Sequence, residues 1–491
     1  MTRNVLMELT ACLEGFAGIP QDTRISYDLL SRNTAANVAG LVMDNGAGTS
    51  GFRYKPSLSR DRQIDQISRY IIAIAEKDQD NEGDLGQRLS KVMTGAGMPW
   101  HVLFNLLGLG RDIFDLDADN FSDYLWSTLF AKTLPATARE AVLSSQFLGT
   151  AVSAHQAFAA AAMGLPPVVI NTSEWDDFIS QKPLNARLSD NTRLWVRYHD
   201  AIPMTHPHTI KSPRLAQKIH YSALRRNAEH ADFVCNSEAT RNALLGLYPD
   251  IGSRTHVVHC CVPDAFFPDH DIDLENILLN RANTDIIPGV KSLEDLMLLK
   301  ESLRGSFSPE YFLAVGTMEP RKNYGAVISA WERLRASSSR DIKLVLVANR
   351  GWGCGKTEQR IASHFTNGNV YLLKNVPLFE LRKLYSNAIA TVASGYAEGF
   401  GFSGIESMKC GTPVIASNIE CHREVYASAA TYFDPYTPAE LTVRMQELIA
   451  VEDKERSERV NVGLTNSERY SESTIAAQWN SAIGLSPAES E

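Results

Sequence analysis

The sequence predicts an α/β protein built from two Rossmann-like domains. First, a chain of 491 residues is too long for a single hydrophobic core, so two domains are expected. Second, apolar stretches of strand length alternate with helical patterns, which favours parallel sheets. Third, a glycine-rich turn joins a strand to a helix at 398–411 and carries Glu398 and Glu406. Both glutamates are then expected at the carboxyl end of a strand, where open α/β sheets bind ligands.

Composition narrows the class of protein. Hydrophobic residues make up 44% and charged residues 21%, which is typical of a soluble globular protein. The net charge of −9 argues against nucleic acid as a partner, because phosphate backbones need a basic face. The seven cysteines form no CxxC pair and are odd in number, so we expect reduced thiols in a cytoplasmic protein. No signal peptide is visible, and the longest apolar stretch, 157–170, is too short to span a bilayer.

The first domain is predicted to begin with a buried strand at 4–9. A loop over 14–24 follows, then a helical pattern at 25–32 and a second strand at 39–44. A glycine-containing loop between a strand and a helix can receive an anion or a sugar, although on these residues alone we favour an ordinary βα turn. The helix-rich region 45–190 is longer than a minimal domain needs, and we interpret it as an insertion that shapes an acceptor site.

Two polar motifs of the first domain have more than one interpretation. DLDAD (115–119) contains Asp-x-Asp, a pattern that elsewhere holds a divalent metal, but no clear strand precedes it, so a solvated turn or helix start is favoured. The predicted helix 212–231 carries Lys218, Arg225 and Arg226. Its cations either form a solvated face, which we favour, or lie on an anionic membrane surface.

The rest of the first domain alternates strands and helices. LWVRY (194–198) reads as a strand that ends at His199 and Asp200. Further strands are predicted at 232–237 and 255–266, with Ser237 beginning a helix between them. We place the first domain at 1–268 and a charged, irregular linker or insertion at 269–308.

The second domain, 309–470, opens with a strand at 311–316 and a helix that starts near Asn323. Gly316 allows the turn, and Arg321 and Lys322 arrive at the helix start. A helix N-terminus with two cations suits a diphosphate, although a solvated basic turn would have the same sequence. GKT (355–357) only imitates a nucleoside-triphosphate loop, because Arg350 stands where that loop needs glycine. The domain is followed at 471–491 by a last helix and a tail.

The glycine-rich stretch 398–417 is the centre of the second domain. Strands are predicted on either side of it, at 390–395 and 413–417. Ser403 is the expected N-cap and Gly411 the expected end of the intervening helix. In a capping box, Glu406 would only reach back to the Ser403 amide. On this pair of residues alone, capping and ligand binding remain equally open.

The wider stretch resembles the signature of the family-four retaining glycosyltransferases, which have the GT-B fold. The resemblance covers 311–450 closely and parts of 1–267 more loosely, and it implies two Rossmann-like domains facing across a cleft. It implies that Glu398 contacts the donor sugar and Glu406 the ribose of the nucleotide. GTMEPRKN (316–323) carries the same resemblance, which assigns the donor diphosphate to Arg321 and Lys322.

The resemblance also assigns roles to smaller motifs. The histidine of the family's first-domain motif lies near the donor phosphate and sugar, and His199 takes that place. Gly18 matches the glycine-rich loop that faces donor and acceptor, while Gln21 stands where arginine is common. Nucleotide contacts are further expected at Gly316, and at Phe400 and Gly401 of the central turn. We expect catalysis to depend on His199, Glu398, Arg321 and Lys322, with no metal and no cofactor.

The sequence therefore predicts a retaining glycosyltransferase that moves a sugar from a nucleotide diphosphate to a glycan or lipid-linked acceptor. GTMEPRKN is similar to bacterial mannosyltransferases of surface polysaccharide and lipopolysaccharide synthesis, which favours GDP-mannose as the donor. Two alternatives stay open on the same fold: a nucleotide-sugar epimerase or phosphorylase, and a non-catalytic nucleotide-sugar binding protein. The expected location is the cytoplasm, with a peripheral contact at the inner membrane face left open.

Overall fold

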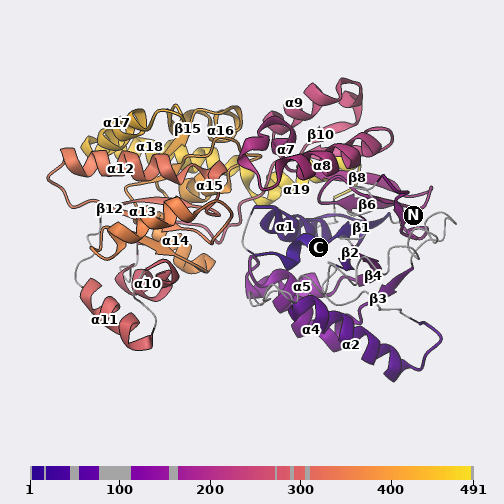
Figure 1. Ribbon diagram of the computed structural model, residues 1–491. Helices are drawn as coiled ribbons and strands as arrows, with labels where there is room; N and C mark the ends of the chain where they lie inside the picture. Colours follow the sequence, from indigo (N-terminus) through magenta and orange to yellow (C-terminus); the bar gives the residue numbers. More distant parts are fainter. Residues whose placement is uncertain are drawn as a thin grey trace.

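The protein has two lobes, each built on a parallel β-sheet flanked by helices (Figure 1). The computed structural model describes residues 3–15, 18–44, 55–76, 112–153, 157, 164–270, 274–287, 292–304 and 310–487. Parts of the region expected to be an insertion (45–54, 77–111 and 154–156), and residues 158–163 of the apolar stretch 157–170, lie outside these described residues. The predicted fold class, two Rossmann-like α/β domains, is confirmed.

The first sheet has the strand order β10-β9-β8-β6-β1-β2-β4-β3, and only the pair of β3 with β4 is antiparallel. Its central strands are buried on both faces, as parallel sheets covered by helices require, while the edge strands β3 and β10 are partly exposed. The bounds are β1 Asn4–Glu8, β2 Asn37–Asp44, β3 Ile113–Asp115, β4 Phe147–Ser153, β6 Asp177–Ser180, β8 Arg193–Tyr198, β9 Asp232–Cys235 and β10 Thr255–Val257. A separate two-stranded sheet pairs β5 Val168–Val169 with β7 Ala186–Arg187.

The helices of the first domain include one that begins earlier than predicted. They are α1 Gly18–Asn33, α2 Arg60–Glu76, α4 Ala118–Leu125, α5 Arg139–Leu143, α7 Ile202–Thr205, α8 Pro213–Ala228 and α9 Glu238–Leu247. The loop predicted over 14–24 is wrong from Gly18 onward. Polar residues suggested a loop there, but they are buried with internal partners: Arg24, for example, donates to the carbonyls of Cys12 and Glu14.

Two other expectations in this domain have clear outcomes. Asp117 of the Asp-x-Asp motif begins helix α4, where its side chain accepts from the Asn120 backbone N–H, so the favoured helix start is confirmed. The strand predicted over 255–266 is wrong beyond Val257. The chain leaves the sheet there: Val258 still packs in the first core, whereas Val262 and Phe266 pack in the core of the second domain.

The second sheet is parallel throughout, with the order β13-β12-β11-β14-β15-β16. Its strands are β11 Tyr311–Val315, β12 Lys343–Val347, β13 Val370–Leu373, β14 Ala390–Ala393, β15 Val414–Ser417 and β16 Ala430–Phe433. Its helices are α12 Tyr324–Ser337, α13 Gly355–Phe365, α14 Leu378–Ser386, α15 Phe402–Lys409, α16 Glu420–Tyr426, α17 Pro438–Ala450 and α18 Asp453–Ser467.

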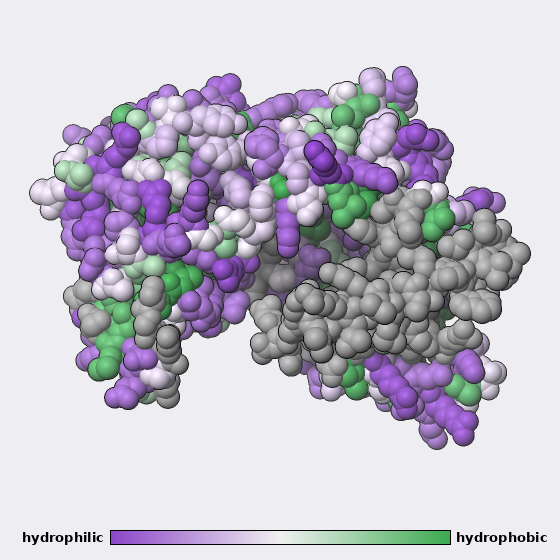
Figure 2. Space-filling model, in the orientation of Figure 1, coloured by the Kyte–Doolittle hydropathy of each residue, from purple (hydrophilic) through white to green (hydrophobic). Residues whose placement is uncertain are grey.

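The segment 269–308 carries two helices, α10 Leu274–Arg281 and α11 Leu293–Leu303. Arg281 forms a bidentate ion pair with Glu380 of α14, at 2.6 and 2.8 Å. Leu303 packs against Phe365 of α13. These helices therefore fold onto the second domain. Hydrophobic surface lies over them at the lower left of Figure 2, where Met297 and Leu298 of α11 are 62% and 66% exposed.

The last helix, α19 Glu472–Ile483, returns to the first domain (yellow in Figure 1). Ile475, Trp479 and Ile483 are buried in the first hydrophobic core. Arg3 donates to the Ile483 carbonyl at 2.7 Å, which joins the start of β1 to the end of this helix. The first domain is thus completed by residues from both ends of the described chain. Among the described helices, none has the length and apolar character to cross a membrane.

Candidate active site

The two sheets present their carboxyl ends to each other at the junction of the lobes. The loop after β8 meets the glycine-rich turn after β14 at Gly399, where an added Cβ would lie 1.9 Å from the His199 carbonyl oxygen. The Gly399 carbonyl accepts a hydrogen bond from Ser237 Oγ at 2.7 Å. Only glycine permits this approach of two backbones. The contact brings the predicted site residues of both domains to one place.

Glu398 lies at the centre of a largely buried cluster of charges, in which the side chains of Arg321 and Lys322 are 19% and 22% exposed. Its Oε2 accepts from Arg321 Nη1 at 2.6 Å, and its Oε1 lies 2.8 Å from Lys322 Nζ. Burial raises the pKa of Glu398, but the two cations outweigh this effect and hold that pKa at about 2. Arg321 also donates to Glu319 at 2.7 Å. The carboxylate is therefore ionised, and the two predicted diphosphate ligands converge on the predicted sugar ligand.

Local backbone geometry brings the two cations to this position. They lie in a 3-10 turn, Pro320–Lys322, between β11 and α12, and Asn323 begins α12 as predicted. Gly316 has a φ of +148°, a conformation that favours glycine, and an added Cβ there would sit 3.2 Å from Lys322 Cε. A side chain at 316 would therefore push against the Lys322 side chain.

Glu406 does not cap its helix, so the capping-box interpretation is wrong. Helix α15 begins at Phe402, after Gly401 in the left-handed region at φ +90°, and Ser403 lies inside the helix. Glu406 is 4% exposed, and its Oε1 accepts from Gln21 Nε2 of the first domain at 2.8 Å. Its Oε2 accepts from Tyr385 Oη at 2.8 Å. Burial raises the pKa of Glu406, although both hydrogen bonds oppose that rise.

His199 stands at the end of β8, on the first-domain side of the junction. Its Nδ1 lies 3.8 Å from an oxygen of Asp22, which is itself held by Arg197 in a buried bidentate pair. Burial lowers the pKa of His199 to about 4, so the ring is neutral at neutral pH. Its Nε2 is buried without a hydrogen-bond partner in the described part of the chain. A neutral ring with an unpaired nitrogen is suited to form a hydrogen bond with a group of a bound ligand.

Other predicted residues take different positions. An added Cβ at Gly18, the first residue of α1, would lie 3.5 Å from the Phe402 ring, so this glycine faces the second domain. The Phe400 side chain is buried against Tyr470 and Phe402, which leaves its backbone for any ligand. Gly401 leaves room for Tyr426, whose hydroxyl donates to the Gly401 carbonyl at 2.6 Å.

Some residues of the junction carried no sequence signal. The Glu424 carboxylate, from α16, accepts from the first two backbone N–H groups of α9 at 2.7 and 2.8 Å. It also pairs with His259 Nε2 at 3.0 Å. This cap joins a side chain of one domain to a helix of the other, so no pattern among residues that are neighbours in the sequence predicts it. Tyr385 likewise reads as a core tyrosine of α14 until the fold brings it to Glu406.

The space around Glu398 is small. A cavity of about 20 Å³ remains, enough for about one water molecule. Its lining comes entirely from the second domain: Ala314, Val315, Lys322, Tyr324, Val392, Ala393, Ser394, Gly395, Glu398, Gly401, Ser403, His422 and Tyr426. A nucleotide sugar is far larger, so binding one here requires the domains or their loops to move apart.

Two parallel-sheet domains that face each other, with cations and a carboxylate at their junction, are the arrangement of the GT-B fold. Residues 301–462 match the family described as glycosyl transferases group 1. This confirms the resemblance found in its motifs. The match covers the strands, the cationic turn and helix α15, but not the first domain.

Curated relatives are similar over part of the chain. O-antigen chain mannosyltransferase B of Escherichia coli is 30% identical over 175 residues, which are 36% of this chain and 46% of that protein. Serotype-specific mannosyltransferase WbdA of Escherichia coli is 26% identical over 269 residues, 54% of this chain and 31% of WbdA. The chain thus spans less than half the length of these relatives.

Solved structures match over nearly the whole chain. Sucrose-phosphate synthase of Thermosynechococcus elongatus has a TM-score of 0.54 at 12% identity, covering 99% of this chain and 98% of that one. Anabaena HepE in complex with UDP-glucose has a TM-score of 0.54 at 13% identity, covering 98% and 99%. At these identities the likeness establishes the fold, and it includes both domains.

We expect Glu406→Gln to weaken nucleotide binding by about 1.5–3 kcal/mol, roughly tenfold or more, because the amide loses charge-assisted acceptance from ribose hydroxyls. The melting temperature should change little. The introduced amide oxygen can still accept from Gln21, and its NH₂ can donate to the Tyr385 hydroxyl. Calorimetric titration with a nucleoside diphosphate, beside thermal unfolding, measures both effects.

Glu380→Gln is the matched control, since Glu380 is a paired carboxylate of the same domain, on α14. It should leave nucleotide affinity unchanged. Wild-type affinity in Glu406→Gln would remove Glu406 from the nucleotide site and leave it as an interdomain contact alone.

Proposed function

We propose that this protein is a retaining glycosyltransferase that moves a sugar from a nucleotide-diphosphate donor to a hydroxyl group of a glycan or lipid-linked acceptor. The observation that carries the proposal is the convergence of Arg321 and Lys322 on Glu398, next to the contact of Gly399 with the His199 backbone. The second domain supplies the nucleotide site, and the first domain supplies the acceptor side. The family match of 301–462 supports the same activity.

Departure of the nucleoside diphosphate places negative charge on its leaving oxygen. Arg321 and Lys322 are positioned to stabilise that charge, and the N-terminus of α12 adds the dipole of its first backbone N–H groups. Burial strengthens these interactions, because less water screens them. When the diphosphate binds, it competes with Glu398 for the two cations. The freed carboxylate is then close to the sugar, where positive character develops.

We propose that the acceptor hydroxyl approaches the sugar from the first-domain side of the junction. His199 and Asp200 close the first-domain side, and Arg321 contributes to the electrostatic environment of Asp200. Burial raises the pKa of Asp200, while Arg321 opposes that rise. Retention of configuration remains part of the proposal, and so does the orientation of the donor by neutral His199.

For the donor we propose GDP-mannose, and for the pathway the assembly of a surface polysaccharide such as lipopolysaccharide. The support is the similarity to O-antigen mannosyltransferases of Escherichia coli and Salmonella typhimurium, at 30% identity over 175 and 174 residues. These matches cover about a third of this chain, so they favour a donor class and do not define the acceptor.

A panel of nucleotide sugars, each incubated with and without an acceptor glycan, tests the proposal. We expect acceptor-dependent release of the nucleoside diphosphate, largest with GDP-mannose, and no loss of rate in EDTA. Metal independence is expected because Arg321, Lys322 and the α12 N-terminus supply the positive charge that the leaving group needs.

The other outcomes separate the alternatives. An altered sugar that stays attached to its nucleotide indicates an epimerase, and tight binding with no turnover indicates a binding protein. Activity that disappears in EDTA and returns with Mg²⁺ or Mn²⁺ overturns metal independence.

We expect Arg321→Ala and Lys322→Ala each to weaken use of the donor by about 1.5–3 kcal/mol, because each loses a charge-assisted contact with the diphosphate. The double variant should fall short of the sum, since both cations meet one group. Steady-state kinetics against donor concentration measures this. Arg444→Ala, which removes a partly exposed arginine of α17 paired with Glu447, is the control. Unchanged donor kinetics in both single variants rules the assignment out.

We also propose a peripheral contact of helix α8 with the anionic cytoplasmic face of the inner membrane. Its exposed residues include the cations Arg214, Lys218 and Arg225, and beside them the apolar Leu215 and Tyr221, each 47% exposed. Cations with neighbouring apolar side chains are the combination that binds anionic interfaces.

Sedimentation with vesicles checks this contact. We expect binding to vesicles that contain phosphatidylglycerol, weaker binding at high salt, and a clear loss in the double variant Arg214→Glu/Lys218→Glu. Lys454→Glu, on the exposed face of α18, is the control for charge. Equal binding of both variants would show that α8 is a solvated face.

A further inference from the structure

His422 is a lining residue of the Glu398 cavity whose chemistry the preceding roles do not use. It lies on α16, 1% exposed, and its ring stacks on Tyr426 with centroids 4.9 Å apart. Its Cδ2 faces Gly401: an added Cβ there would be 3.3 Å from that atom. A buried histidine beside the central glycine turn therefore forms part of the wall around Glu398.

The hydrogen bonds of the ring fix which nitrogen carries the proton. Nδ1 lies 3.1 Å from the Ser417 carbonyl oxygen and 3.0 Å from Ser417 Oγ. The carbonyl oxygen can only accept, and the Ser417 hydroxyl already donates its hydrogen to the Gly395 carbonyl at 2.6 Å. Nδ1 must therefore donate. In the neutral ring this leaves Nε2 as an acceptor.

The ring is neutral, because burial lowers the pKa of His422 to about 4 even though Glu398 opposes that change. Nε2 is bonded to Cδ2 and so lies on the ring edge toward Gly401, away from Ser417. It is buried without a hydrogen-bond partner in the described residues. An unpaired buried acceptor destabilises the folded protein. Buried polar groups normally have a hydrogen-bond partner, so we infer that a bound ligand supplies the partner of this nitrogen.

The cavity is of the right size and polarity for one hydroxyl group. Its volume of about 20 Å³ matches a single water molecule, and a sugar hydroxyl replaces a water with the same hydrogen-bonding atoms. Its polar lining includes an anionic acceptor, Glu398, a cation, Lys322, and the neutral acceptor His422. Charges at Glu398 and Lys322 suit several ligands, whereas an acceptor without charge selects a hydroxyl or amide donor.

We propose that Nε2 of His422 accepts a hydrogen bond from one hydroxyl group of the transferred sugar, and that this contact helps to select the sugar. The inference rests on the proposed function, since it names a subsite of the same donor. A site built to pair with a hydroxyl rejects an analogue that lacks it, because its own polar group is then left unpaired. His422 thereby determines specificity, while Arg321 and Lys322 hold the diphosphate common to all donors.

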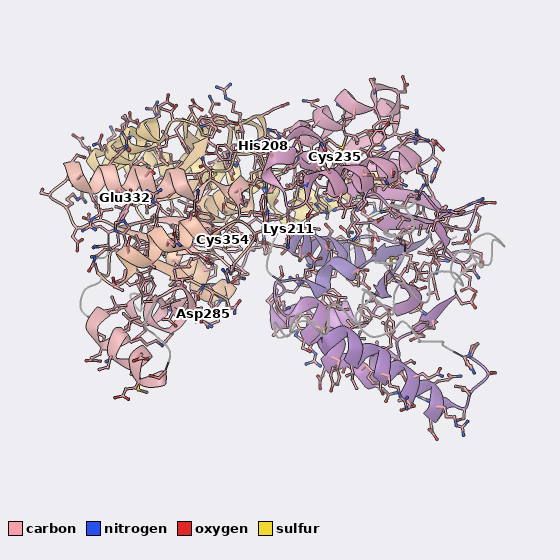
Figure 3. The ribbon with its side chains drawn as sticks, in the orientation of Figure 1. His208, Lys211, Cys235, Asp285, Glu332 and Cys354 are labelled. Atoms are coloured by element: carbon pink, nitrogen blue, oxygen red, sulfur yellow. The ribbon has the colours of Figure 1, made fainter. Side chains whose placement is uncertain are left out.

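Calorimetry with GDP and GDP-mannose, and with UDP and UDP-glucose, tests the subsite. His422→Phe keeps the ring and its stacking on Tyr426 but removes the acceptor. We expect its affinity for the preferred nucleotide sugar to fall about tenfold, with affinity for the free nucleoside diphosphate unchanged. His422→Gln, whose amide oxygen can reach the place of Nε2, should recover part of the loss. His364→Phe, in which a histidine paired with Glu332 on the outer side of the second domain is replaced, should change neither affinity (Figure 3).

Monodeoxy analogues of the preferred donor identify the hydroxyl. On the wild type, one analogue should bind about tenfold more weakly than the parent sugar, and in His422→Phe that difference should disappear. These measurements with wild-type protein remain decisive even where His422→Phe is unstable. Equal losses for sugar nucleotide and free nucleotide, or a wild type that binds all analogues alike, would overturn the subsite. A wild type that binds no nucleotide at all would overturn the proposed function as well.

Discussion

The charge cluster of Arg321, Lys322 and Glu398 is the interaction on which the site depends. Three charged groups taken from water carry a large desolvation cost, which only close pairing offsets. The cluster is therefore stable as long as its partners stay together, and replacing Glu398 by a ligand phosphate exchanges one anion for another. In the proposed donor complex both cations would therefore stay paired with an anion.

At the contact between the domains, too, single carboxylates pair with several groups. Glu406 receives a donor from each domain, Gln21 and Tyr385, and Glu424 caps a helix of the opposite domain. A carboxylate has about four acceptor positions, so Glu406 retains capacity beyond these two bonds. A ribose hydroxyl could share the carboxylate or displace Gln21 from it. The proposed ribose contact would therefore couple ligand binding to the position of the domains.

The sequence predicted the fold class and most of the second domain because local signals there agree. The cationic turn, Asn323 at the start of α12 and Gly411 after the end of α15 follow from neighbouring residues. The capping box at Ser403 failed because Gly401, in a left-handed conformation, begins the helix two residues earlier. Tyr426 packs against Gly401 from the next helix, α16. Long-range packing decided between two locally acceptable starts.

What the sequence could not predict are contacts between residues hundreds of positions apart. Gln21 and Glu406 are separated by 385 residues, and nothing near either one indicates the other. The polar start of α1 was likewise hidden, because buried polar side chains with internal partners have the composition of a loop. Both failures concern the junction of the domains, where function is expected and where ordinary patterning rules are weakest.

Because α19 returns to the first domain, the chain passes between the two domains twice, and the two crossings together form the hinge. The chain crosses outward near Val262 and back near Tyr470, and the Val262 backbone N–H donates to the Tyr470 carbonyl at 3.0 Å. Because the two crossings are joined at one point, we expect any opening of the lobes to be a rotation about that point. Such a rotation would bring His199 back to Gly399 on closing.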